Sequence, residues 1–174
     1  MSRFDTCLEF VLAREGKYSN NPADRGGATN QGITQVNYDA WRVAHGLSRK
    51  PVLGISGAEV SEIYTTGYWQ PVRANELVPP LDLCLFDAAV QHGPRRAIKW
   101  IQRVVGAMPD GVLGPKTLTL LALLIERDGL DAVINDYMAI RDGFYHEIVA
   151  NDISQAVFLK GWMNRMDALR EAVE

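Results

Sequence analysis

Hydrophobic residues recur at helical spacing over most of the chain. Phe4, Cys7, Leu8 and Val11 share one face and predict an amphipathic helix over residues 3–14. The same periodicity predicts further helices over residues 34–46, 56–70, 81–92, 94–106 and 115–124, and near 129–149 and 153–171. Strict polar–apolar alternation never runs long enough to demand a sheet. The pattern therefore predicts a mainly α fold of about eight helices.

Several helix starts have recognisable caps. Thr34 can cap the second helix, and Ser56 with Glu59 three residues later forms a capping box. Gly93-Pro94 and Gly114-Pro115 each place a proline in the first helical turn. These signals fix where the predicted helices begin.

The segment 16–33 breaks the helical pattern. It contains four glycines, three asparagines, a proline and an aspartate. Such a composition predicts a long irregular loop after the first helix, with room for a small hairpin.

Composition limits the function classes. The chain has 174 residues, 47% hydrophobic and 22% charged, which is typical of a globular protein. Its net charge is −3 and neither half is basic, so we expect no nucleic-acid partner. Cys7 and Cys84 could form a disulfide, but within apolar runs we expect two buried thiols.

The first residues carry charges and lack a long apolar core, so we expect no signal peptide and synthesis in the cytoplasm. No run approaches the ~18 apolar residues of a membrane span, so we expect no stable membrane insertion.

Glu15 and Asp24 are the candidate catalytic pair. Glu15 stands where a helix meets a loop, so apolar packing on one side would favour its protonated form, whereas Asp24 lies in a polar loop beside Arg25. Two carboxyls in such different environments suit acid–base cleavage of a glycosidic bond. The hydroxyl of Thr29 could position a water molecule.

Each of these residues also has a structural interpretation. Glu15 can be a solvated charge at a helix end, Asp24 a turn residue bonded to its own backbone, and Thr29 a loop hydroxyl or cap. Gly26-Gly27 can form a tight turn or allow a substrate to approach the backbone. Tyr18 is a candidate for flanking a sugar.

The block from Glu15 to Thr34 resembles the N-terminal motif of glycoside hydrolase family 108, the N-acetylmuramidases of phage endolysins and bacterial secretion activator proteins. Lys17 replaces the family's second glycine, and Asn21 stands where aspartate is common. The matching positions are Glu15, Gly16, Tyr18, Pro22, Asp24, Gly26, Gly27, Ala28, Thr29, Gly32, Ile33 and Thr34.

The resemblance implies that Glu15 is the catalytic acid. The spacing to Asp24 and Thr29 is also similar to that of phage-type lysozymes, in which these positions would activate and orient water. It further implies a compact lysozyme-like fold, with a catalytic muramidase region over residues 1–80. The implied substrate contacts in this region are Tyr18, Gly26 and Gly27.

The second half is similar to the predicted peptidoglycan-binding region that accompanies this family, over residues 83–121, and its end, 158–169, to the family's C-terminal helix. We expect residues 81–174 to form this helical region and to pack with the first as one globule. A purely structural role for it stays open.

Asp87 and His92 are the candidate substrate contacts in this half. An aspartate in an apolar helix needs a partner, and Arg95 or Arg96 is an alternative to a sugar. Arg95, Arg96 and Lys99 form the best basic cluster of the chain. It could attract the lactyl and peptide carboxylates of a muramyl peptide, or be a solvated helix face.

The sequence shows no phosphate loop or dinucleotide fingerprint, so no cofactor is expected. The three histidines are widely separated and lack the spacing of zinc ligands, so no metal is expected either.

The expected activity is hydrolysis of the β-1,4 bond between N-acetylmuramic acid and N-acetylglucosamine in peptidoglycan, during phage lysis or protein export. A lytic transglycosylase and a non-catalytic peptidoglycan-binding or secretion-assisting module are the alternatives. The expected partners are peptidoglycan glycan strands, reached in the periplasm or cell wall through a holin or an export pore.

Overall fold

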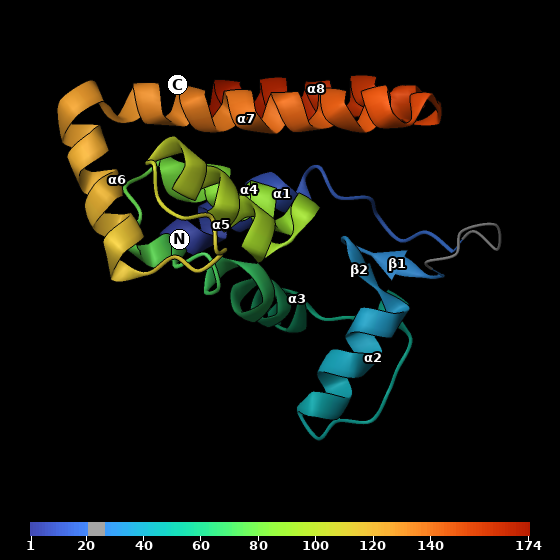
Figure 1. The fold of residues 1–174 in the computed structure, drawn as a ribbon. Coiled ribbons are helices and arrows are strands. Elements are labelled where there is room, and N and C mark those ends of the chain that lie inside the picture. The colour runs from blue at the N-terminus through green and yellow to red at the C-terminus, as the bar shows by residue number, and fades with distance from the viewer. Residues whose placement is uncertain (21–26) are drawn as a thin grey trace. The chain divides into compact units, whose positions relative to one another are not determined.

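A computed structural model describes residues 1–20 and 27–174 of the chain (Figure 1). These residues form eight α-helices, four short 3₁₀ or π turns and one two-stranded hairpin, which confirms the predicted mainly α fold. The chain divides into two compact units, an N-terminal unit (Met1–Gly67) and a C-terminal unit (Tyr68–Glu174). Each unit has its own packed interior.

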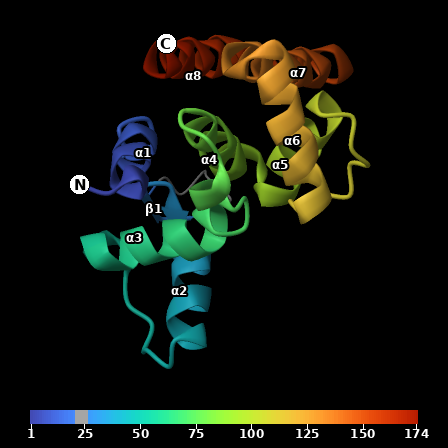
Figure 2. The same cartoon turned by 90° about the vertical axis from the view of Figure 1, so that its left-hand side faces the viewer.

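The helices of the N-terminal unit begin at the predicted caps. The Thr34 hydroxyl accepts a hydrogen bond from the Asn37 N–H, and Ser56 and Glu59 form a reciprocal capping box. A second capping box, between Ser2 and Asp5, opens the first helix. The helices are α1 (Arg3–Leu12), α2 (Gln35–Ala44) and α3 (Gly57–Tyr64), seen from a second side in Figure 2.

The loop after α1 contains the small hairpin. Its strands are β1 (Thr29–Asn30) and β2 (Ile33–Thr34), which pair antiparallel. Gln31 and Gly32 form the two-residue turn with φ values of 50° and 77°. Positive φ at both positions is the conformation of a type I′ turn, whose twist matches that of the strands it joins.

A partly buried polar cluster joins α2 to α3. Glu59 Oε2 accepts hydrogen bonds from Lys50 Nζ at 3.1 Å and from the Ser56 N–H at 2.9 Å, and Arg42 pairs with the other carboxylate oxygen. Burial alone would raise the pKa of Glu59. The bonds from Ser56 and Lys50 outweigh it and lower the pKa to about 2.

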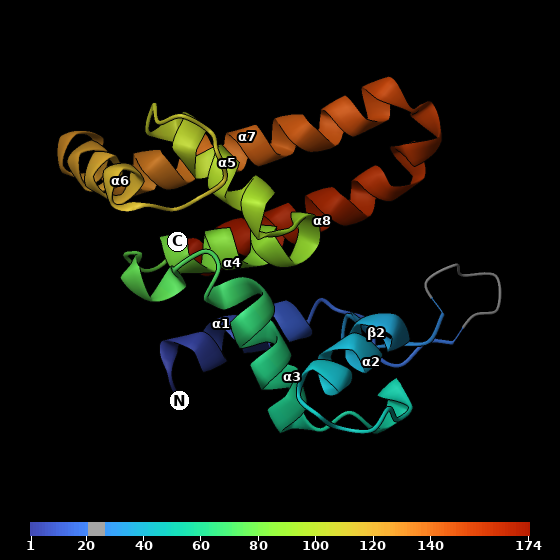
Figure 3. The same cartoon turned by 60° about the horizontal axis from the view of Figure 1, so that its bottom comes forward.

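The C-terminal unit surrounds one buried helix. In α4, nine of the twelve residues are buried, and the helix packs against α5, α7 and α8. Helices α7 and α8 run antiparallel along the unit (Figure 3). The elements are η3 (Ala74–Glu76), α4 (Leu81–His92), α5 (Pro94–Val104), α6 (Pro115–Asp128), α7 (Leu130–Asn151), η4 (Ile153–Gln155) and α8 (Ala156–Val173).

Asp87 of α4 connects three helices through its carboxylate. Its Oδ2 lies 2.7 Å from Arg141 Nη1 on α7, and its Oδ1 lies 2.7 Å from Arg165 Nη2 on α8. Burial alone would raise the pKa of Asp87, but the two guanidinium groups hold it below the usual range. A carboxylate at this position therefore stays charged and paired inside the core.

The two cysteines behave as expected from their apolar surroundings. Cys7 and Cys84 are both fully buried thiols, which confirms the prediction against a disulfide. Among the described residues, no helix combines the length and the apolar character needed to cross a membrane.

We expect the stability of the N-terminal unit to fall in acid because of Glu59. Since its pKa is lower in the folded unit, its contribution is complete above about 4.5 and is lost as the pH falls toward about 2. Glu59→Gln should lower the free energy of unfolding by about 1–3 kcal/mol at pH 7 and flatten this dependence. Denaturant unfolding at several pH values measures both effects. Glu62, on the exposed face of α3, provides the control Glu62→Gln, and an equal effect of that variant would contradict the assignment.

We also expect Asp87→Asn to destabilise the C-terminal unit by about 3–5 kcal/mol, because it leaves two guanidinium groups without their carboxylate. Urea unfolding provides the measurement. Asp128→Asn removes an exposed partner of Arg127 on the same unit and should cost much less. Equal losses in the two variants would show that the Asp87 network does not stabilise the core.

Candidate active site

Glu15 lies at the end of α1, on the N-terminal unit. After Leu12 the helix tightens, and the N–H groups of Arg14 and Glu15 both donate to the Val11 carbonyl, at 2.9 and 3.1 Å. Val11 is fully buried, so this turn is anchored to the core. The anchored turn leaves Glu15 half-buried at the start of the loop.

The Glu15 side chain meets the turn of the hairpin at Gly32. A Cβ on Gly32 would lie 2.9 Å from Glu15 Oε2 and 2.6 Å from the hydroxyl of Tyr64, closer than ordinary contacts permit. Tyr64 comes from α3, is almost fully buried, and donates its hydroxyl hydrogen to the Gln31 carbonyl at 2.8 Å. The carboxyl group is therefore placed by three segments of the unit: the end of α1, the hairpin turn and α3.

Thr29 lies at the opposite end of the same hairpin. Its backbone exchanges two hydrogen bonds of 2.8 Å with Ser19 and pairs across the hairpin with Thr34. The side chain is half-buried, and its hydroxyl lies 3.5 Å from the Gly27 carbonyl. Thr29 is thus held rigidly by its backbone on both sides.

Tyr18 and Gly27 flank this pairing. Tyr18 directly precedes Ser19 and is 42% exposed, so its ring is accessible to a ligand. Gly27 is exposed, with φ of 68° and no atom within 4 Å of the place of a Cβ. Asp24 and Gly26, the other predicted site residues of the loop, lie outside the described residues.

Asp87 and His92 belong to the C-terminal unit. Asp87 is fully buried between Arg141 and Arg165 and presents no surface to a ligand. Neither of the two alternatives, a sugar or a pairing with Arg95 or Arg96, is therefore met: those arginines start on the exposed face of α5, while the Asp87 carboxylate pairs with α7 and α8.

His92 is partly accessible and sits among aromatic rings. Its ring centroid lies 5.1 Å from that of Trp100 and 5.3 Å from that of Phe144, and its Nε2 lies 2.9 Å from the Tyr145 hydroxyl. Burial first, and the positive charge of Arg141 second, lower its pKa to about 3. His92 is therefore neutral at physiological pH.

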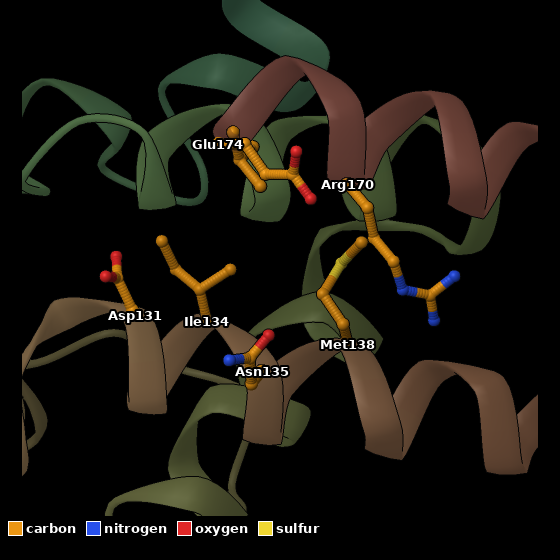
Figure 4. Close-up of a pocket in the computed structure, with 7 residues that line it drawn as sticks. Asp131, Ile134, Asn135, Met138, Arg170 and Glu174 are labelled. Carbon is orange, nitrogen blue, oxygen red and sulfur yellow. The ribbon is translucent and has the colours of Figure 1, made fainter.

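A separate hollow on the C-terminal unit lies between α7 and α8 (Figure 4). Ile134 and Met138 point from α7 toward α8, and Arg170 descends from α8 beside them. The volume of this hollow is about 340 Å³. Arg170 pairs with Asp142 and Asp167, so its charge is already matched within the unit.

No group of three or more histidine, cysteine or acidic side chains in residues 1–20 and 27–174 is arranged to hold a metal ion.

The sequence gives little or no sign that two residues, Tyr64 and Gly32, help to place Glu15. Tyr64 has no local signal, because its partner, the Gln31 carbonyl, is 33 positions away. Gly32 was identified only as part of the motif, although a glycine in a two-residue turn is itself a signal for a hairpin.

Comparison with known proteins agrees with the motif. Residues 8–93 match the family model described as Glycosyl hydrolase 108, and residues 96–167 match the one described as Predicted Peptidoglycan domain. A search of the curated proteins found no match. Among solved structures, the chain is similar to SagA of Brucella abortus, with 31% sequence identity and a TM-score of 0.79.

The similarity to SagA covers 98% of this chain and 92% of the SagA chain, so it extends over both units. Together with the two family matches, it confirms the resemblance inferred from the loop motif and supports a glycoside hydrolase function related to peptidoglycan. The chain belongs to the glycosyl hydrolase 108 family.

Proposed function

We propose that this protein is an N-acetylmuramidase that hydrolyses the β-1,4 bond between N-acetylmuramic acid and N-acetylglucosamine, with Glu15 as the general acid. The observation that carries the proposal is the position of the Glu15 carboxyl group, held against Gly32 and Tyr64 at the end of α1. Hydrolysis of a glycosidic bond requires an acid to protonate the leaving oxygen. Glu15 lies within the matched residues 8–93 and, by the resemblance of its motif, stands at the position of the family's catalytic acid.

The geometry suits proton donation. The side chain is half-buried, so one oxygen can face substrate while the rest of the carboxyl group packs against the hairpin turn. The Gly32 backbone and the Tyr64 hydroxyl leave little free space beside Glu15 Oε2, and this confinement favours a fixed position of the acid while a sugar binds. General acid catalysis of this kind contributes on the order of 10²–10⁴-fold to a rate.

In this proposal Asp24 activates the attacking water and Thr29 orients it. Ser19 and Thr29 are hydrogen-bonded to each other through their backbones, so the segment that carries Asp24 starts and ends at one fixed place on the unit. If Asp24 is the base, its carboxyl group should lie about 6.5–9.5 Å from that of Glu15 and the reaction should invert the anomeric centre. A lytic transglycosylase would need no such base.

The deciding experiment is digestion of purified sacculi with analysis of the new chain ends. A muramidase releases reducing N-acetylmuramic acid ends, whereas a lytic transglycosylase releases anhydromuramyl ends. Binding of sacculi with no release of either end would indicate a non-catalytic module and would overturn the proposal.

Glu15→Gln should abolish release of reducing ends, with a loss of about 10²–10⁴-fold, because the amide cannot donate the proton. Glu9→Gln, on the exposed face of α1, removes the same charge and should retain activity. Thermal unfolding of both variants checks that the fold is kept. Activity of Glu15→Gln within a few-fold of the unmodified protein would refute the assignment.

Gly32→Ala tests whether the hairpin turn positions the acid. Gly32 and Gly46 both have positive φ, 77° and 68°, but only at Gly32 would a Cβ strike other atoms. We expect both alanine variants to lose about 1–2 kcal/mol of stability from backbone strain. Only Gly32→Ala should also lower kcat, by about 10–100-fold, because it displaces Glu15. Equal kcat values for the two variants on soluble glycan strands would show that the contact does not position the acid.

A further inference from the structure

A groove rich in positive charge opens on the C-terminal unit between α5 and α7. Its volume is about 720 Å³. Helix α5 contributes Arg96, Lys99 and Arg103, which are spaced three and four residues apart and so share one face, together with Arg95, which directly precedes Arg96. We call this feature, defined by these four residues, the cationic groove.

Aromatic side chains form one side of the cationic groove. Trp100 of α5 and Phe144 of α7 both line it, with ring centroids 5.3 Å apart. The Arg96 guanidinium carbon lies 4.7 Å from the centroid of the Phe144 ring, which is a cation–π arrangement. Stacking on the ring restrains the guanidinium group and leaves its N–H edge available to an acceptor.

Three cations of the cationic groove, Arg96, Lys99 and Arg103, form no ion pair within the unit. Across the described chain, no carboxylate forms an ion pair with Arg96, Lys99 or Arg103. Arg95 donates to the backbone carbonyl of Asp110 at 3.2 Å, and its charge also helps to lower the pKa of the Asp110 carboxyl group. In the same unit, Arg141 and Arg165 each face Asp87 at 2.7 Å. Three of the four cations of the cationic groove therefore have no carboxylate partner among the described residues, in a chain whose net charge is −3.

The carboxylate of Glu147, which also lines the cationic groove, favours a ligand that carries a positive group as well as negative ones. Glu147 of α7 lines the cationic groove together with the α5 cations. A ligand with several carboxylates and one amino group would match this pattern. Nucleic acids and phosphatidylglycerol surfaces carry only negative charges, so Glu147 would oppose them.

The stem peptide of peptidoglycan has this chemistry, because it carries several carboxylates and an amino group on its diamino acid. We propose that the cationic groove binds the stem peptide, with the α5 cations facing its carboxylates and Glu147 facing its amino group. The inference rests on the proposed function in taking peptidoglycan as the substrate. It assigns the peptide part of that substrate to the C-terminal unit.

Calorimetric titration with the N-acetylglucosaminyl–N-acetylmuramic acid disaccharide carrying its tetrapeptide tests the proposal on the full chain. In this ligand N-acetylmuramic acid is the reducing-end sugar, so the bond from N-acetylmuramic acid to a following N-acetylglucosamine, which a muramidase cleaves, is absent. Binding is therefore measured independently of catalysis. The triple variant Arg96→Gln, Lys99→Gln, Arg103→Gln should bind about tenfold more weakly, the combined effect of three partly exposed ion pairs. Its residual binding should also respond less to added salt.

The matched control removes three exposed cations elsewhere on the same unit: Lys116→Gln, Arg127→Gln, Lys160→Gln. It changes the net charge equally and should leave the affinity unchanged. Unfolding temperatures of both triple variants verify that the unit is folded. Equal weakening in the two variants would show a general charge effect and would overturn the proposal.

Glu147→Gln tests the other end of the ligand. It should weaken binding of the tetrapeptide ligand but not of the same ligand with its amino group acetylated.

Two results would overturn the proposal. One is that the unmodified protein binds the peptide-free disaccharide as tightly as the tetrapeptide ligand. The other is that the cationic groove binds phosphatidylglycerol vesicles or DNA but not the tetrapeptide ligand. Release of reducing ends from sacculi is measured separately, so failure of the groove and failure of the muramidase proposal remain distinct.

Discussion

The close approach of Glu15 and Tyr64 to the backbone of Gly32 is the constraint on which the candidate active site depends. A side chain at position 32 would occupy the space of both groups, so the hairpin turn, the end of α1 and α3 can meet only if this residue is glycine. The type I′ turn makes the same demand, because it needs positive φ at this position. One residue thus satisfies a backbone requirement and a packing requirement together.

The C-terminal unit uses charge in two contrasting ways. Inside it, Asp87 pairs with Arg141 and Arg165, and this pairing fixes α4 against α7 and α8. On its surface, the cationic groove has arginine and lysine side chains without such partners. Breaking a buried ion pair of this kind lowers the free energy of unfolding strongly, whereas an exposed charge without a partner lowers it little and can pair with a ligand.

Most of the fold could be predicted because its signals are local. The apolar run of Leu81–His92, the cap at Ser56 and the prolines after Gly93 and Gly114 each act within a few residues, and the helices begin as these signals indicate. The same holds for Glu15, which was found from a motif in continuous sequence. Its place at the end of α1 follows from the helix pattern that precedes it.

Contacts between distant segments could not be predicted in this way. The Tyr64 hydroxyl reaches a carbonyl 33 positions away, and Asp87 bonds Arg165 across 78 positions. A sequence pattern shows that a buried aspartate needs a partner, but several arginines satisfy the requirement equally well. The neighbouring Arg95 and Arg96 are such candidates, but the packing of α7 and α8 on α4 places the guanidinium groups of Arg141 and Arg165 against Asp87 instead.

The paired backbones of Ser19 and Thr29 have a consequence for how this site can vary. Because both ends of the intervening segment are fixed to each other, insertions or deletions between them need not move α1 or the hairpin. The entropic cost of a longer connection is small, about 0.6 kcal/mol for each doubling of length. A longer or shorter segment is thus compatible with an unchanged arrangement of Glu15, Gly32 and Tyr64.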